Sequence, residues 1–159
     1  MRFNFRPKMK KIFFLGLVIF AVSSGVYAGP AENIPVEKLL EPQVLAAHLA
    51  TTTTAKAPLL LQVGFRTLYV QAHIPKSVYA GPGNSNEGLK RLEGVLKKTG
   101  KKQAIVLYCG CCPWSHCPNI AAALKKTTDL GFKNVKVLHM DHDFGKDWAD
   151  AAYPVEAGE

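Results

Sequence analysis

The chain has 159 residues and a formal net charge of +8 at pH 7, a length that suits one domain of ordinary size. Residues 1–28 hold five Lys or Arg and no Asp or Glu, so their removal lowers the net charge to +3. The basic character therefore belongs mainly to the N-terminus, and it gives no reason to expect a nucleic-acid partner.

These first 28 residues have the three parts of a secretory signal. A basic start precedes the apolar run Ile12–Val22, and small and polar residues follow, ending in Val26-Tyr27-Ala28. The apolar run is too short for a comfortable membrane span, although an uncleaved anchor is the alternative interpretation. We expect a signal peptide over residues 1–28, a folded domain over residues 29–159, a periplasmic or secreted protein, and no membrane contact after cleavage.

The first half of the domain alternates helical and extended patterns. Apolar residues at helical spacing over 36–49, interrupted by Pro42, predict a short helix, a break and a second helix. The apolar run Pro58–Val63 predicts a buried strand, residues 68–72 predict one helical turn, and Ser77–Ala80 predicts a short extended segment.

The second half repeats this alternation. Asn86 is expected to cap a helix that Gly100 ends, and Ala104–Tyr108 is expected to form a strand buried on both faces. A helix follows from Asn119 and stops near Gly131, then a strand over Asn134–His139 and a partly helical segment over 144–153. Strands that alternate with helices predict an α/β fold with a parallel sheet.

All four cysteines, Cys109, Cys111, Cys112 and Cys117, lie in the loop between the strand that ends at Tyr108 and the next helix. Cys109 stands where the strand ends, and ligands bind at this edge of open parallel sheets. The positive end of the helix and free backbone N–H groups favour a thiolate there. We therefore predict that Cys109 is a nucleophilic or redox-active cysteine, although small local disulfides such as Cys109–Cys112 or Cys112–Cys117 are a structural alternative.

Several segments in a fixed order resemble the rhodanese-like domain family. They are the strand Leu59–Val63 with Gly64, the element Ala72-His73-Ile74-Pro75, the strand that ends in Cys109, the turn and strand 131–138, and Trp148 with Tyr153-Pro154-Val155. The resemblance implies an open parallel sheet with helices on both faces and Cys109 as the catalytic nucleophile. It also implies a sulfurtransferase that takes sulfur from thiosulfate or another sulfane-sulfur donor, carries it as a persulfide, and needs no cofactor.

The chain departs from the family pattern around this cysteine. Gln62 and Gly64 stand where the family usually has Asp and Arg, and Trp114 occupies the sixth loop position, where the family has Arg. Backbone amides from Gly110 to Ser115 would cradle the substrate, and only His116 offers a positive or hydrogen-bonding side chain in the loop. The predicted substrate-binding loop is Gly110, Cys111, Cys112, Trp114, Ser115 and His116, and the expected partner is a small sulfur-containing anion or a protein persulfide or thiol.

Three other functions use the same residues. A dithiol oxidoreductase would form a reducible disulfide between Cys109 and Cys112, which are spaced as a Cys-x-x-Cys pair. In a sulfurtransferase, Cys111, Cys112 or Cys117 could instead resolve a persulfide on Cys109. A soft-metal module for copper or zinc would use Cys109, Cys112, His116 and Cys117, with Cys111, His139 and His142 nearby. An inactive rhodanese fold that binds partners is the fourth possibility.

Overall fold

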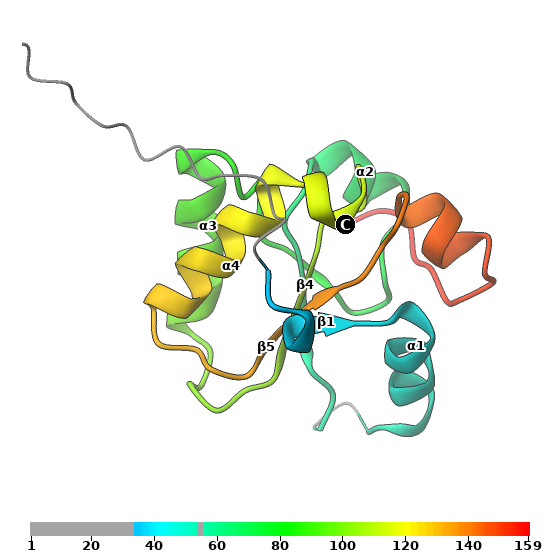
Figure 1. Ribbon diagram of the computed structural model, residues 1–159, viewed down its shortest axis with the longest axis horizontal. Coiled ribbons are helices and arrows are strands. Elements are labelled where there is room, and N and C mark those ends of the chain that lie inside the picture. Colours follow the sequence, from blue (N-terminus) through cyan, green and yellow to red (C-terminus); the bar gives the residue numbers. More distant parts are fainter. Residues whose placement is uncertain (1–33, 54–55) are drawn as a thin grey trace, which may run out of the picture.

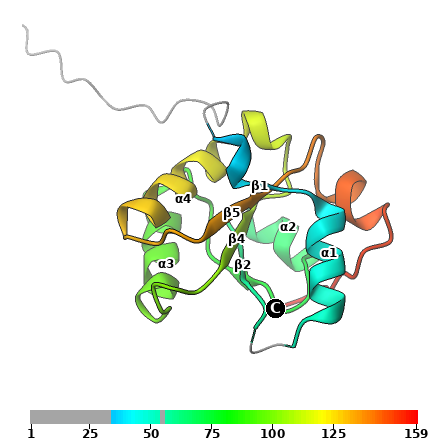
Figure 2. The ribbon, with the colours of Figure 1, turned by 60° about the horizontal axis from the view of Figure 1, so that its bottom comes forward.

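The computed structural model describes residues 34–53 and 56–159, so the predicted signal peptide lies outside the described residues. The chain forms a five-stranded sheet in the order β1-β5-β4-β2-β3, and every strand pair is parallel. Helices cover both faces of the sheet (Figures 1 and 2). The predicted α/β class, with an open parallel sheet, is confirmed. Within the described ranges, no helix is both long and apolar enough to cross a membrane.

The elements follow one another in strict alternation after the first turn. The strands are β1 (Leu39–Leu40), β2 (Leu59–Gln62), β3 (Val78–Tyr79), β4 (Ile105–Tyr108) and β5 (Val135–Leu138). The helices are α1 (Pro42–Thr51), α2 (Arg66–Gln71), α3 (Asn86–Lys97) and α4 (Pro118–Asp129). Two short 3-10 turns, η2 (Val36–Lys38) and η3 (Trp114–His116), and the π-helical turn η4 (Gly145–Ala149) complete the described elements.

Side chains along each central strand alternate between two separate cores, as the pleat of a strand requires. Leu61, Leu107 and Val137 face α3 and α4, whereas the intervening Leu60 and Val106 face α1. Both sets are buried, which explains why β2 and β4 are apolar without interruption.

The N-terminal region differs from the prediction. Residues 36–40 form a 3-10 turn and the strand β1, and β1 pairs with β5 through Leu39 with Val137 and Leu40 with Leu138. Pro42 does not break a helix but opens α1, because the first helical position needs no N–H donor. The cap of α3 is Ser85 and not Asn86, since the Ser85 hydroxyl accepts the Gly88 N–H at 3.0 Å.

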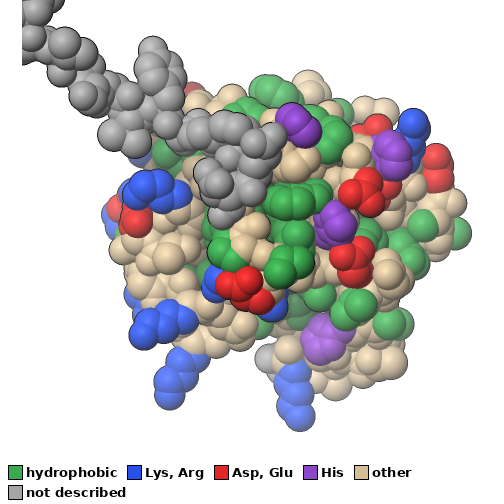
Figure 3. Space-filling model, in the orientation of Figure 1, with side chains coloured by type: hydrophobic (Ala, Val, Ile, Leu, Met, Phe, Trp, Pro, Cys, Tyr) green, Lys and Arg blue, Asp and Glu red, His purple; other side chains and the backbone are tan. Residues whose placement is uncertain are grey.

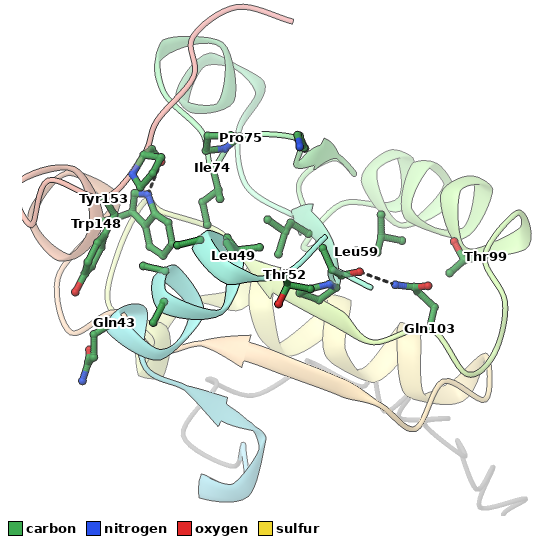
Figure 4. A pocket seen from close by; sticks show the side chains of 18 of the residues that line it. Gln43, Leu49, Thr52, Leu59, Ile74, Pro75, Thr99, Gln103, Trp148 and Tyr153 are labelled. Carbon is green, nitrogen blue, oxygen red and sulfur yellow. Dashed lines mark hydrogen bonds between the residues drawn. The ribbon is translucent and has the colours of Figure 1, made fainter. Parts of the chain in front are cut away.

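A pocket of about 910 Å³ opens on the face of the sheet that α1 covers. Leu49 of α1, Thr52 just after α1, Leu59 of β2, and Trp148 and Tyr153 line it (Figure 4). The loop before β4 closes one end, where the Gln103 side chain donates to the Ala57 carbonyl at 3.1 Å. No cysteine is among the described residues that line this pocket.

Candidate active site: a cluster of four cysteines

The cysteine loop begins at the carboxyl end of β4. Cys109 follows Tyr108 directly, and its side chain belongs to the core on the α3 and α4 face, where the residue is 1% exposed. The neighbouring chain after β2 leaves little room for it: a β-carbon on Gly64 would lie 2.8 Å from the Cys109 sulfur. Glycine at position 64 therefore allows the sulfur to occupy this site.

Gln62 holds Cys109 in place from the neighbouring strand. Its side-chain N–H donates to the Cys109 carbonyl at 2.9 Å, and its side-chain oxygen accepts the Gly64 N–H at 3.2 Å. Gln62 is buried, so these two bonds satisfy a polar group that would otherwise be costly in the core. Sequence analysis noted Gln62 only as a departure from the family pattern, and its position two residues before the close-packed Gly64 was the available signal.

Asn119 in the first turn of α4 holds the sulfur itself. Its side-chain N–H donates to the Cys109 Sγ at 3.4 Å, and its side-chain oxygen accepts the Asn84 N–H at 3.1 Å. Asn119 is buried and was not predicted as a site residue. An Asn in the first turn after a cysteine loop carries no specific signal in one sequence, because such residues are also common near helix starts.

Gly110 then turns the loop back over Cys109. Its φ of +88° lies in the left-handed region that favours glycine, and its carbonyl accepts the Phe144 N–H at 3.2 Å. As a result, the Cys111 sulfur lies 3.2 Å from the Cys109 sulfur, and the Cys112 sulfur lies 3.1 Å from that of Cys111.

Cys117, the residue before α4, completes the cluster. The sulfurs of Cys109, Cys111 and Cys117 all lie within 4.8 Å of one another. Cys109 and Cys117 are buried, whereas Cys111 is partly exposed, and all four cysteines are free thiols. The structure thus brings together the predicted nucleophile and the three predicted resolving thiols.

Contacts among the four cysteines shift their pKa values in different directions. Hydrogen bonds from Cys109 and Cys117, and a further one from Cys112, lower the pKa of Cys111 well below its ordinary value. The bond from Cys109 to Cys111 raises the pKa of Cys109, and burial raises it further. The sequence predicts that helix and backbone N–H groups favour a thiolate at Cys109, whereas this hydrogen-bond network favours a thiolate at Cys111, the sulfur that the others surround.

The backbone amides of the loop form only part of the expected cradle. The Trp114 N–H donates to the Met140 carbonyl at 2.9 Å, and the His116 N–H donates to the Pro113 carbonyl at 3.1 Å. These two groups are therefore engaged, and Pro113 has no N–H. The Cys111 amide does lie against the cluster and favours the thiolate forms of Cys109 and Cys111.

Carboxylates lie beside the loop. His139, at the end of β5, contacts Glu41 at 2.6 Å and Asp141 at 3.1 Å, and its ring meets Trp114 edge-on at 5.6 Å between centroids. His116 contacts the Ser115 hydroxyl at 2.9 Å. Figure 3 shows histidines beside acidic side chains on this face of the molecule. The carboxylates of Glu41 and Asp141 thus lie at the rim of the cysteine loop, each paired with His139.

The metal-ligand geometry differs from the predicted set. Among the described residues, the group with atoms close enough to share an ion is Cys109, Cys111 and Cys117. The predicted alternative set had Cys112 and His116 in place of Cys111. The Cys112 sulfur lies 3.1 Å from that of Cys111 but is not part of the group whose atoms all lie within 4.8 Å of one another.

Comparisons with known proteins agree with this architecture. The structure resembles the protein BH2092 from Bacillus halodurans, with a TM-score of 0.57 and 24% identity over 74% of this chain and 75% of that one. It also resembles the rhodanese-like domain of the Anabaena protein Alr3790, with a TM-score of 0.55 and 18% identity over 76% and 79% of the two chains. Identities this low show a shared fold alone.

A further structural relative is EanB, solved as a variant in complex with hercynine. The TM-score is 0.51 and the identity 24%, over 76% of this chain but 27% of EanB. No curated protein matches the sequence. A model of the rhodanese-like domain family matches residues 41–141, which is well over half of the chain. The matched region runs from just before α1 to just beyond β5. The chain therefore belongs to the rhodanese-like domain family.

Proposed function

We propose that this protein is a sulfurtransferase or persulfide-handling protein in which Cys111 is the thiolate that first accepts sulfur. The observation that carries this proposal is the position of Cys111: the residue is partly exposed, and its sulfur lies 3.2 Å and 3.1 Å from the sulfurs of Cys109 and Cys112. A thiolate, rather than a thiol, is the nucleophile in such chemistry.

The transfer step conserves charge and electrons. The Cys111 thiolate forms a bond to the outer sulfur of the donor, and the bond from that sulfur to its carrier breaks. The carrier leaves with the electron pair, as sulfite from thiosulfate or as a thiolate from a persulfide. Cys111 then holds a persulfide, which a second thiol attacks to remove the sulfur.

Cys109 has a supporting role in this proposal. Its buried sulfur lies within hydrogen-bond distance of the Cys111 sulfur, and Gln62 and Asn119 hold its carbonyl and its sulfur in place. The sequence-based assignment of Cys109 as the sulfur carrier remains the competing prediction, and the same experiment separates the two.

The donor is expected to be a persulfide on a small thiol or on a protein, rather than thiosulfate. The loop from Cys109 to Cys117 contains no Lys or Arg, and Glu41 and Asp141 flank His139 at its rim. Binding a dianion in a loop without Lys or Arg is unfavourable, because a charge removed from water needs a partner and His116 is the one side chain of the loop that could become a cation.

Intact-mass analysis with peptide mapping tests the proposal. Reduced protein is treated with thiosulfate or with a small-molecule persulfide, and we expect one added sulfur atom on Cys111, faster from the persulfide. Cys111→Ser should gain no sulfur, whereas Cys109→Ser should still gain it, more slowly. Loss of the added sulfur in Cys109→Ser, with retention in Cys111→Ser, would instead establish the sequence-based assignment.

We also propose that the protein acts in the periplasm or outside the cell, on the basis of its three-part N-terminal pattern. N-terminal sequencing of the protein recovered from the exporting cell should find Gly29 as the first residue. Recovery of the intact Met1 terminus on cytosolic protein would contradict export.

A further inference from the structure

The cysteine cluster has a geometry that sulfur transfer does not require. Its three sulfurs come from one loop: Cys109 follows β4 directly, Cys111 lies two residues further on, and Cys117 is the residue before α4. They lie within 4.8 Å of one another, and two of the three residues are buried. A single accepting thiolate would need neither the third sulfur nor its burial.

We propose that Cys109, Cys111 and Cys117 form a three-coordinate site for the soft monovalent cation Cu(I). Metal–sulfur bonds of about 2.3 Å place three sulfurs around an ion about 4 Å apart in a plane. The sulfur separations in the structure run from 3.2 Å for Cys109 and Cys111 to at most 4.8 Å, so they bracket this value. Small side-chain rotations are sufficient to close the triangle around an ion.

The donor set selects the ion. All three donors are sulfurs, and among the described residues no histidine or carboxylate joins the group. Thiolate donors favour Cu(I), whereas structural zinc sites almost always hold four protein ligands. The Cys112 sulfur contacts that of Cys111 but is not a member of the triangle, so the group with mutually close donor atoms supplies three ligands.

The surroundings meet the other requirements of a metal site. Asn119 donates to the Cys109 sulfur at 3.4 Å, and Gln62 holds the Cys109 carbonyl at 2.9 Å, so residues behind the ligands fix the position of one of them. Cys111 is partly exposed and gives the ion an entry path. Binding involves no electron transfer: each ligating thiol that is protonated releases its proton to solvent, and copper enters and stays as Cu(I).

Anaerobic titration with Cu(I) against a chromogenic copper chelator tests the site in the complete reduced chain. We expect one Cu(I) per chain, bound by three sulfurs at about 2.3 Å in X-ray absorption at the copper edge. Cys109→Ser, Cys111→Ser and Cys117→Ser should each weaken binding by more than about a hundredfold, since even residues behind metal ligands contribute about 10–100-fold.

Cys112→Ser is the matched control, because it removes a sulfur of the same loop that lies outside the triangle. It should bind Cu(I) as the wild type does. Equal losses in Cys112→Ser and Cys117→Ser would overturn the assignment of the three ligands, and a four-coordinate zinc ion bound in preference to Cu(I) would overturn that of the ion. Circular dichroism of each apo variant shows whether a loss of binding reflects unfolding. If substitution of the buried Cys109 or Cys117 unfolds the protein, Cys111→Ser still tests the site, because Cys111 is partly exposed and its substitution should leave the fold intact.

The copper site goes beyond sulfur transfer, and the two can fail separately. Copper binding is measured with no sulfur donor present, and sulfur addition is measured without copper. Because both use the Cys111 sulfur, copper-loaded protein should gain no sulfur from a persulfide donor. Sulfur addition to Cys111 at an unchanged rate in the copper-loaded protein would contradict the proposed ligand set.

Discussion

The two faces of the sheet differ in how they are filled. On the α3 and α4 face, Cys109 and Cys117 are themselves members of the core, packed with Val63 and Ile120. On the α1 face, Trp148 and Phe144 pack against the sheet, but a pocket of about 910 Å³ remains open. The sulfurs of Cys109 and Cys117 are therefore positioned by a closed core, whereas no cysteine lines the pocket on the other face.

Substitution of Trp148, on the α1 face, should give the largest loss of stability while leaving the cysteines of the other face unaffected. Its side chain is fully buried and donates to the Pro154 carbonyl at 2.8 Å, so Trp148→Ala enlarges the pocket and should lower the free energy of unfolding by about 3–5 kcal/mol. Urea denaturation measures the loss. At low urea the folded variant should still alkylate its cysteines in the wild-type order, and a changed order would show that the two faces are coupled.

Alkylation of the native protein should distinguish the buried from the exposed sulfurs. Iodoacetamide should modify Cys111 first, whereas Cys109 and Cys117 react only after local opening. An opening that costs about 3 kcal/mol slows their reaction by about a hundredfold. Tandem mass spectrometry of the loop peptide gives the order, with urea-unfolded protein as the control, and equal native rates for Cys109 and Cys111 would contradict the closed core.

Gly64 and Gly94 form a matched pair that tests the packing behind the cluster. A β-carbon at Gly64 would lie 2.7 Å from the Cys109 carbonyl oxygen, so Gly64→Ala should destabilise the fold by about 1–3 kcal/mol. A β-carbon at Gly94, on the exposed surface of α3, meets nothing within 4 Å, so Gly94→Ala should stabilise it by up to about 1 kcal/mol. Thermal unfolding compares the two, and effects of the same sign would show that Cys109 is not tightly enclosed.

The smallest effect is expected at the surface of the closed face. Glu93 of α3 contacts Lys126 of α4 at 2.7 Å and Lys97 at 3.0 Å, and these lysines lower the pKa of Glu93 to about 2. Because the folded-state pKa lies below the unfolded one, the stabilisation is present above pH 4.5 and is lost as the pH falls toward 2.

Solvent screens this partly exposed group, so Glu93→Gln should change the melting temperature only slightly at pH 7, and by still less at pH 2. Added salt should reduce the difference further. A large difference that persists at pH 2 would assign Glu93 a role other than its charge.

Long apolar runs allowed much of the fold to be predicted. The strands β2 and β4 were predicted within a few residues because burial on both faces leaves an uninterrupted apolar pattern. The helices α3 and α4 were predicted from helix-forming residues that end near Gly100 and Gly131, and β5 from its β-branched residues. The strand β1 was missed, since two leucines at helical spacing become a strand only by pairing with β5, almost a hundred residues away in the chain.

The site was predicted in place but not in detail. The loop and its four cysteines were identified from the strand, loop and helix pattern, yet the pattern does not show which sulfur the others surround. That depends on the left-handed turn at Gly110, on Gln62 from another strand, and on the burial of Cys117. Each of these comes from contacts between segments that are distant in sequence.

Cys117 occupies the N-cap of α4, a position where a serine or aspartate oxygen commonly accepts a backbone amide, but its side chain makes no such bond. A hydroxyl there typically contributes about 1 kcal/mol to helix stability. The helix thus begins with a poor cap, and the same atom is the third corner of the sulfur triangle. A serine at position 117 would stabilise the start of α4 but would remove the third sulfur, so the cysteine keeps the sulfur triangle at a cost in helix stability.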